Sequence, residues 1–381
     1  MLAFTSDAVR TLVAADSVDL TDRVAAVERA VAMPMPSSQQ EVWRYSRIGD
    51  LDLEEFRPGA AATTVSGGNG CVSVGSTGAT AEPIDVRVHD LFDELGIAFH
   101  QAVHVIVPAG KVLAEPIVVT HVIDEEGVAS FPRLVIDGGA DSEFTVVEQF
   151  VSHADVRALV VPRLYVRAAQ AARVSYLGIN LLGTKVWQLG HQQAIGERDS
   201  TTLLATVALG GDYARVRTDA QVAGQGASTR QVALYFADGD QMHDFRTLQD
   251  HIAPKTNSDL LFKGAVQDHA KSVYTGLIRI RHDAKGSVAY QTNRNLTLSK
   301  GAWAESVPNL EIETNDVKCS HASTVGPIDE EQRFYLESRG IPPEVAERLV
   351  VLGFFDEVLA QLPVGVLAGE LRARLNAKVA R

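Results

Sequence analysis

A cysteine and a histidine near the end of the chain are the residues whose types and spacing best suit chemistry. Cys319 and His321 stand two apart in the segment NDVKCSH at 315–321. Residues two apart on a β-strand project from the same face, so the two side chains are expected to lie side by side. A thiolate and an imidazole form a soft ligand pair that suits iron, an iron–sulfur species or zinc.

The same pair also permits a simpler interpretation. Lys318, and His321 when protonated, are expected to favour the thiolate form of Cys319. Two ligands do not complete a metal site, however, so another chain, sulfide or solvent would have to supply the rest. The spacing therefore leaves open a buried structural thiol beside a hydrogen-bonded histidine.

The chain lacks the common motifs of nucleotide and hydrolytic sites. It contains no G-x-x-x-x-G-K-[ST] motif, so no bound nucleotide is expected and any ATP use belongs to a partner. No G-x-S-x-G, H-E-x-x-H or C-x-x-C motif occurs either, and no catalytic residue is predicted. Eight other histidines are expected to be structural or solvent-facing: His100, His104, His153, His191, His243, His251, His269 and His282.

Composition restricts the class of protein. The chain has 381 residues, of which 46% are hydrophobic and 22% charged, and this is typical of a globular protein. Its net charge of −13 argues against binding to nucleic acid or to an anionic membrane, since both require a basic surface. The only two cysteines are Cys71 and Cys319, which excludes a scaffold built on disulfides.

Several features predict a cytoplasmic protein. The N-terminus has no basic start, no continuous apolar stretch and an early Asp7, so it is not typical of a secretory signal. The longest uncharged run, 58–81, consists mainly of Gly, Ser, Thr and Ala and is not expected to span a membrane. Two unpaired cysteines agree with a reducing interior.

The chain divides into three regions that differ in composition and in predicted secondary structure. Residues 1–82 are expected to form two short helices between 6 and 32, ended by the prolines of 33–38, and then a Gly/Ser-rich linker or loop. Residues 83–327 contain short apolar, β-branched runs with few amphipathic helical windows, which predicts a sandwich, barrel, propeller or solenoid. The clearest predicted strands are 103–107, 117–119, 134–136, 144–147 and 159–161.

A weak repeat selects the solenoid. Strand starts preceded by small or polar residues recur at intervals of 28 to 30 residues, and two similar starts, at Val216 and Val273, fall near the half-period. Stacked coils with two strands each produce such a pattern, so a parallel β-helix is predicted. The recurring starts are Phe144, Val174, Leu203, Val232, Leu260 and Val288.

Residues 328–381 are expected to be helical again. Asp329 and Gln332 have the spacing of a capping box, and Gly340 is suited to end that first helix. Pro342 and Pro343 then stand where a second helix can begin. These helices are expected either to cap the solenoid or to present a docking face to a partner.

Many ordered matches make the chain resemble the SufB/SufD family, the scaffold proteins of the SUF iron–sulfur cluster assembly system. The matches are dense in the C-terminal third and sparse elsewhere. They lie at 43–45, 258–260, 263–264, 276, 289–291, 293–298, 308–312, 315–321, 324–326, 334–336 and 338–341. With its short length, two cysteines and Cys-Ser-His motif, the chain is more similar to the SufD branch. Ala322 and Ser323 stand where SufD proteins often have Gly-Ala.

The resemblance implies a fold and partners. It implies a right-handed parallel β-helix that pairs with a SufB-like paralogue, with Cys319 and His321 at the interface where a nascent iron–sulfur cluster or iron is held transiently. It also implies that the C-terminal helices bind the ABC-type ATPase SufC, which makes this chain a non-catalytic scaffold. The residues expected in that second contact are Phe334, Tyr335, Leu336, Arg339 and Gly340. A reduced flavin is associated with the family's complex, but no flavin motif occurs and flavin binding is left open.

Two alternatives remain open at this point. The solenoid alone permits an exported β-helix enzyme that acts on polysaccharide, although the missing signal argues against it. A homodimeric scaffold of the SufB/SufD type, acting without a separate SufB, is the other. Cys71 has no assigned role.

Overall fold

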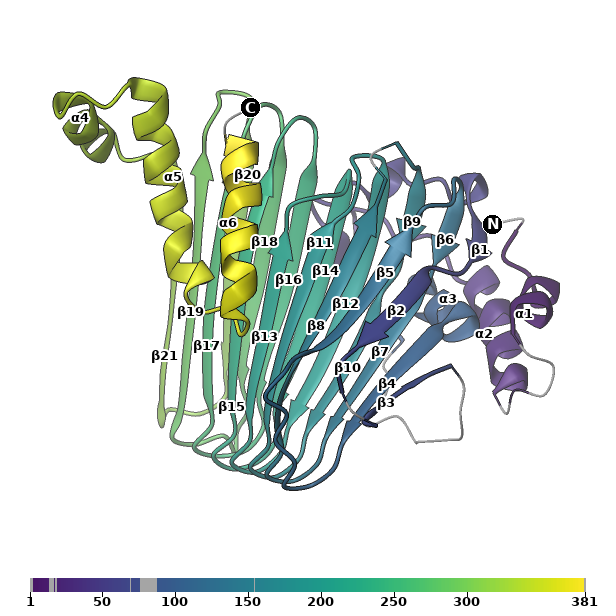
Figure 1. The fold of residues 1–381 in the computed structure, drawn as a ribbon. Helices are drawn as coiled ribbons and strands as arrows, with labels where there is room; N and C mark the ends of the chain where they lie inside the picture. The colour runs from purple at the N-terminus through teal and green to yellow at the C-terminus, as the bar shows by residue number, and fades with distance from the viewer. Residues whose placement is uncertain are drawn as a thin grey trace.

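The centre of the molecule is a parallel β-helix of eight coils with helical segments at both ends (Figure 1). The computed structural model describes residues 3–13, 17, 19–68, 70–75, 88–153 and 155–379. The predicted fold class, mainly β with flanking helices, is confirmed. The predicted boundary between residues 82 and 83 lies outside the described residues.

The strands alternate between two sheets. In spatial order, the smaller sheet contains β2 (Ala62–Ser66), β5 (Ile117–Ile123), β8 (Glu143–Ser152), β11 (Arg173–Leu181), β13 (Thr201–Ala208), β15 (Ser228–Ala237), β17 (Asn257–Val266), β19 (Ser287–Thr297) and β21 (Val317–Gly326). The larger sheet contains β3 (Val72–Val74), β4 (Gln101–Val107), β7 (Pro132–Gly138), β10 (Arg163–Ala168), β12 (Val186–Gly196), β14 (Tyr213–Val222), β16 (Met242–His251), β18 (Lys271–Ile280) and β20 (Trp303–Ile312). The short strands β1 (Arg57–Gly59), β6 (Val128–Ser130) and β9 (Ala158–Val160) lie beside that path.

The length of one coil explains the sequence repeat. Thr201 pairs with Ser228, 27 residues later, and Asn257 pairs with Val288, 31 residues later. The predicted period and the prediction of two strands per coil are therefore confirmed. The predicted register was wrong by up to three residues, since Leu260 pairs with Gln291 instead of Val288. The corners between strands differ in length, and the apolar residues at which the strands were predicted to start do not reveal this difference.

One corner of the β-helix repeats the same turn. The residue two positions before a strand of the smaller sheet has a positive φ in successive coils, for example 57° at Asp141 and 55° at Asp199. The turns stack on one another, because the N–H of Asp141 donates to the carbonyl of Gln170 at 2.9 Å. Asp and Gly tolerate this backbone conformation better than most residues, which accounts for small and polar residues before the strands.

The N-terminal segment covers the outer face of the larger sheet. The helices α1 (Ser6–Leu12) and α2 (Leu20–Ala32) confirm the two predicted helices, and three 3₁₀ turns follow, η1 (Glu41–Trp43), η2 (Ile48–Asp50) and η3 (Leu53–Glu55). Trp43 packs against Phe92, and the guanidinium carbon of Arg215 on β14 lies 4.1 Å from the Trp43 ring centroid. These contacts fix the N-terminal segment on the β-helix.

A third N-terminal helix, α3 (Leu91–Phe99), was not predicted. Its N-cap is Asp90, whose carboxylate accepts hydrogen bonds from the backbone N–H groups of Phe92 and Asp93. Apart from Ile97, every residue of α3 is buried. A helix that is buried all round lacks the one-sided apolar stripe by which a surface helix is recognised in a sequence.

The Gly/Ser-rich stretch is not simply a linker, and that prediction was wrong for β1, β2 and β3. β2 pairs with β5 and β3 pairs with β4, both antiparallel, so the stretch adds an edge strand to each sheet. Cys71, just before β3, is buried in the core with Val103 and Val105, and the Lys111 ammonium donates to its sulfur at 3.1 Å. Cys71 therefore has a packing role.

The C-terminal helices follow the predicted pattern. α4 (Glu330–Ser338) begins after Asp329, whose carboxylate accepts hydrogen bonds from two backbone N–H groups, and Gly340 follows it with a φ of 84°. α5 (Pro343–Leu359) and α6 (Gly365–Val379) pack over the outer face of the smaller sheet. Lys263 on β17 holds α5 against the smaller sheet, because its ammonium group donates a hydrogen bond to the carbonyl of Phe354 at 2.9 Å. The last solenoid strand ends at Gly326.

Candidate functional site

The C-terminal end of the β-helix ends in two uncovered strands. β20 pairs with β18 and β21 pairs with β19, and no described strand lies on their other sides. Both are ten residues long, and β21 lies at the left end of the β-helix in Figure 1. The outer edge of each strand therefore presents a row of backbone N–H and C=O groups that another strand can pair with.

Cys319 and His321 lie on β21 in the row that faces the inside of the β-helix. Cys319 pairs with Ala289 and His321 with Gln291, and both of these partners are buried. The next residue of the row, Ser323, donates to the hydroxyl of Ser306 on β20 at 2.7 Å, so the row faces the opposite sheet. The two side chains share a face, as their spacing predicts, and they lie at the open end of the interior.

The environment of Cys319 differs from the sequence-based expectation. Cys319 is half-buried, and it packs with Val317 against Ile278 and Ile280 of β18. Burial raises the pKa of the Cys319 thiol, because a thiolate loses its hydration there. The expected stabilisation of the thiolate by Lys318 was wrong, since Lys318 is adjacent in sequence and projects from the opposite face of β21.

His321 is exposed, and apolar side chains surround the same end. Leu310 and Ile312 on β20 and Val325 on β21 are all exposed, although their positions continue rows that are buried in the preceding coil. Ile278 and Ile280, which pair with Leu310 and Ile312, are completely buried. The end of the β-helix therefore exposes a surface with the chemical character of a core. It combines this surface with free strand edges and a Cys–His pair.

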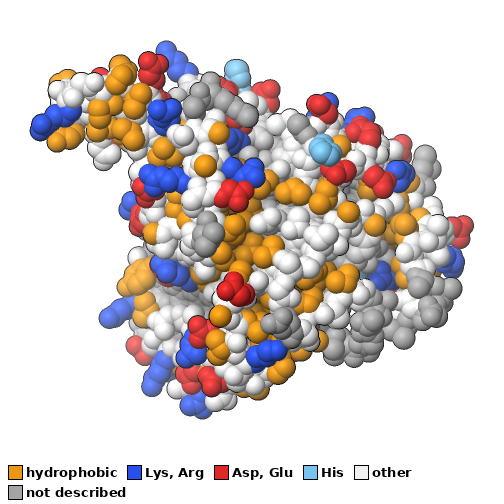
Figure 2. Space-filling view, in the orientation of Figure 1, with side chains coloured by type: hydrophobic (Ala, Val, Ile, Leu, Met, Phe, Trp, Pro, Cys, Tyr) orange, Lys and Arg blue, Asp and Glu red, His pale blue; other side chains and the backbone are white. Residues whose placement is uncertain are grey.

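A second exposed surface lies on α4. No residue of α4 is buried, and Phe334 and Tyr335 are 71% and 57% exposed. Figure 2 shows hydrophobic side chains gathered on this helix, which projects from the body of the molecule. The Arg339 guanidinium carbon lies 5.2 Å from the Tyr335 ring centroid. A groove between α4 and α5 is lined by Leu296, Asp329, Glu331, Gln332, Tyr335, Leu336, Leu349, Val350, Gly353 and Phe354.

Several of the histidines expected to be structural or solvent-facing are buried in the β-helix. Burial lowers the pKa of His243 to about 3 and that of His251 to about 4, so both rings are neutral near pH 7. The His251 ring hydrogen-bonds with the hydroxyls of Thr256 and Ser258, both at 2.7 Å. His191 differs, because carboxylates flank both of its ring nitrogens.

Comparison with known proteins identifies the family. The family model described as "SUF system FeS cluster assembly, SufBD core domain" matches residues 121–354, more than half of the chain. The chain belongs to the SufBD family. A SufBD family protein of Mycobacterium tuberculosis is 33% identical over 373 residues, covering 91% of this chain and 89% of that protein. SufD of Escherichia coli is 31% identical over 280 residues, covering 72% of this chain and 66% of that protein. SufD of Bacillus subtilis is 29% identical over 275 residues, covering 72% and 63%.

Membership of the SufBD family gives the chain a role in iron–sulfur cluster assembly, as a scaffold-type subunit of the SUF system. This result favours cluster assembly over the polysaccharide-cleaving enzyme that the solenoid alone permitted. Among the described residues, no helix is both long and apolar enough to cross a lipid bilayer. The matched core region contains both Cys319 and His321 as well as α4.

Proposed function

We propose that this chain is a SufD-like subunit whose open β-helix end pairs with a SufB-like paralogue. In this proposal Cys319 and His321 contribute ligands to iron or a nascent cluster, which is the cargo of the assembly and is completed by ligands from the partner. The observation that carries the proposal is the position of the two side chains on β21, in the last coil and at the open end.

The structure of that end supports pairing with a second β-helix. The free edges of β20 and β21 can extend both sheets into a partner, as in other complexes that form by strand addition. The exposed Leu310, Ile312 and Val325 would then be buried, as their counterparts are within the chain. Strand pairing and apolar burial together provide both orientation and affinity for a partner with a similar end.

The protonated thiol suits a site that forms only on assembly. A metal ion binds the thiolate, so ligation must release the proton of Cys319. Since burial raises the pKa of Cys319, the isolated chain keeps this thiol protonated near neutral pH. A second set of ligands from the partner, together with the positive charge of iron, would overcome this cost. The isolated chain is therefore expected to bind iron weakly.

The C-terminal helices are proposed to dock a SufC-like ABC-type ATPase. The exposed aromatic side chains of Phe334 and Tyr335 and the adjoining groove support this role, because aromatic anchors next to an apolar groove are typical of protein interfaces. Leu336, Arg339 and Gly340 belong to the same contact surface in the proposal. ATP hydrolysis is assigned to the partner, and this chain transmits its motion to the β-helix end.

The first experiment tests the Cys–His pair in the assembled complex. The chain is co-expressed with its SufB-like and SufC-like partners, and Cys319→Ala with His321→Ala is compared with Lys318→Ala and Ser320→Ala on the opposite face of β21. The first variant is expected to lose most bound iron and sulfide while the complex still assembles. The control variant is expected to keep both. Full iron and sulfide content in the first variant would contradict the proposal.

The second experiment tests the helical surface. Phe334→Ser with Tyr335→Ser is expected to abolish co-purification with the ATPase while the paralogue is retained. Val112→Ser is the control, because Val112 is exposed on another part of the chain. If the ATPase is retained by the α4 variant, the docking surface lies elsewhere. A chain that forms only a symmetric dimer in the presence of the paralogue would favour the homodimeric alternative.

A further inference from the structure

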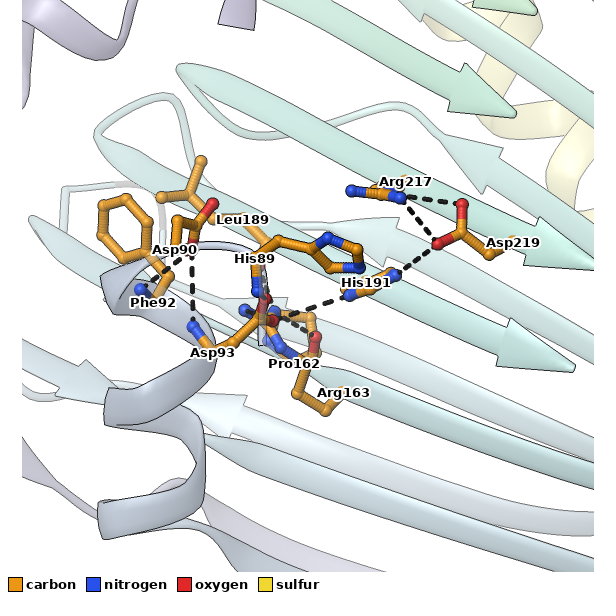
Figure 3. A network of polar contacts seen from close by, with 10 residues as sticks. All are labelled: His89, Asp90, Phe92, Asp93, Pro162, Arg163, Leu189, His191, Arg217 and Asp219. Atoms are coloured by element: carbon orange, nitrogen blue, oxygen red, sulfur yellow. Dashed lines mark hydrogen bonds and ion pairs between the residues drawn. The ribbon is translucent and has the colours of Figure 1, made fainter. Parts of the chain in front are cut away.

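Two histidines and an aspartate meet on the outer face of the larger sheet, far from Cys319 in the sequence. His89 lies in the segment before α3, His191 lies on β12 and Asp219 lies on the neighbouring strand β14. One ligand atom from each of the three lies within 4.8 Å of the others. Figure 3 shows the two imidazole rings turned toward each other beside the carboxylate.

The three side chains differ in how they are held. His191 and Asp219 are buried, and the His191 Nε2 atom lies 3.1 Å from the Asp219 carboxylate. The His89 and His191 ring centroids are 5.5 Å apart. The His89 ring makes no hydrogen bond within the part of the chain that the structure describes. Unlike the other two residues, His89 is exposed to solvent.

A second layer of groups orients these side chains. The Nδ1 atom of His191 lies 3.5 Å from the Asp93 carboxylate, which is also bound by Arg163 at 2.9 Å and by the backbone N–H of His89 at 2.8 Å. Arg217 holds Asp219 at 2.9 Å. A carboxylate on the far nitrogen of an imidazole is the usual arrangement behind a metal-binding histidine, because it fixes the tautomer and orientation of the ring.

We propose that His89, His191 and Asp219 bind a divalent transition-metal ion of the zinc or ferrous class. Two imidazoles, once the Nε2 proton of His191 has left, and one carboxylate form a donor set that suits these ions. Metal–nitrogen distances of about 2.0–2.1 Å require the ligand atoms to lie closer together than the 4.8 Å within which they are found here. His89 can supply that movement, since it precedes α3 and is not part of a strand or helix. Solvent or a partner would complete the coordination.

The proton balance at the site is simple. When the ion binds, the proton on the Nε2 atom of His191 is released to solvent and the ion takes its place beside Asp219. The other proton stays on Nδ1, shared with Asp93. The alternative is that His191 remains an imidazolium that joins the two carboxylates and binds no metal ion.

Binding would connect the segment before α3 to two strands of the β-helix. The N-terminal helices and the β-helix would then be joined through a metal ion as well as through apolar packing. This inference does not rest on the proposed function, because it involves neither Cys319 nor His321. The two sites also differ in donor chemistry, since only the open end contains sulfur.

The test uses Co²⁺ as a spectroscopic probe on the full-length chain. The background variant carries Cys319→Ser and His321→Ala, so that the open end cannot contribute ligands. This variant is expected to bind one Co²⁺ per chain, with visible ligand-field absorption and without thiolate-to-cobalt charge transfer. Adding His89→Ala is expected to weaken Co²⁺ binding at least tenfold. Adding His153→Ala, at an exposed histidine, is expected to leave the affinity unchanged.

A second measurement, the effect of Zn²⁺ on the Tm, distinguishes loss of metal binding from poor folding of a variant. Zn²⁺ at saturating concentration is expected to raise the Tm of the background variant but not that of the His89→Ala variant, because an ion that binds only the folded state stabilises it. Circular dichroism establishes that the variants are folded before either measurement. The absence of Co²⁺ binding by the background variant would overturn the proposal. Equal affinities of the His89→Ala and His153→Ala variants would overturn it as well.

Discussion

The two ends of the β-helix differ in how far their outer strands and apolar residues are covered by other parts of the chain. At the N-terminal end the short antiparallel strands β2 and β3 lie along the sheet edges, and α1 and α3 cover an aromatic cluster that includes Phe131. At the C-terminal end β20 and β21 leave long edges and exposed apolar residues such as Leu310. Natural sheets usually protect their edges, so the unprotected edges at this end agree with the proposed pairing with another molecule.

The electrostatic contrast points the same way. At the N-terminal end buried charges are matched within the chain, as where Arg23 donates to Asp19 at 2.8 Å and to the backbone carbonyl of His100 at 2.9 Å. At the C-terminal end His321 is exposed and hydrogen-bonds to none of the described residues. The buried charges of the N-terminal end are paired within the chain, whereas His321 is left available for the proposed partner.

The largest expected effect comes from disrupting the aromatic cluster at the N-terminal end of the β-helix. Phe131 is completely buried, and its ring lies 5.7 Å from that of Phe99 and 6.3 Å from that of Phe4. Phe131→Ala leaves a cavity there and is expected to lower the free energy of unfolding by about 3–5 kcal/mol. Urea unfolding of the isolated chain measures this change. A loss below about 1 kcal/mol would show that the N-terminal cap is not part of the cooperative core.

The next effect concerns association at the open end. Leu310→Lys with Ile312→Lys places charges where the proposed partner would bury apolar surface. This change is expected to weaken binding to the SufB-like partner about a hundredfold, or roughly 2.7 kcal/mol, with the fold retained. Affinity measured by titration tests it, and Val112→Lys is the matched exposed control. Unchanged affinity of the double variant would exclude this end as the interface.

A pH dependence should distinguish the ends further. Burial, followed by the charges of Arg133 and Arg23, lowers the pKa of His100 at the covered end to about 3 from its ordinary value of 6.5. Below pH 6.5 His100 is therefore protonated in the unfolded chain but stays neutral in the folded chain. The free energy of unfolding consequently falls as the pH decreases toward 3. The maximum slope is about 1.4 kcal/mol per pH unit.

Hydrogen exchange at pH 7 and pH 5 measures this effect in each region. The N-terminal helices are expected to lose more protection at pH 5 than β20 and β21 do. His100→Gln is the control and is expected to reduce the difference by about 1–2 kcal/mol. If this variant shows the same pH dependence as the original chain, His100 does not cause the acid sensitivity.

The smallest effect completes the comparison. Leu310→Ala removes an apolar side chain of similar character to that of Phe131, but from a solvent-exposed position. In the isolated chain it is expected to change the free energy of unfolding by no more than about 0.5 kcal/mol. Urea unfolding again provides the measurement. A loss of 2 kcal/mol or more would mean that the open end is already packed in the isolated chain.

Prediction from the sequence worked where the signal is local. The coil period and the helix N-cap at Asp329 follow from turns and hydrogen bonds between near neighbours, and both are present in the structure. It failed for α3, which is buried on nearly all sides, and for β2 and β3, whose strand pairing depends on distant partners. The predicted strand register was wrong because the corners between strands differ in length from one coil to the next.

The sequence by itself determined that Cys319 and His321 share a face, because strand periodicity is a property of the local backbone. Only the tertiary structure decided that this face lies at an open end, and that burial raises the pKa of the thiol. Likewise, His89 lies far from His191 and Asp219 in the sequence, and only the packing of α3 against the larger sheet brings the three together. Burial, and proximity between distant segments, depend on how the coils and helices pack, which no local pattern contains.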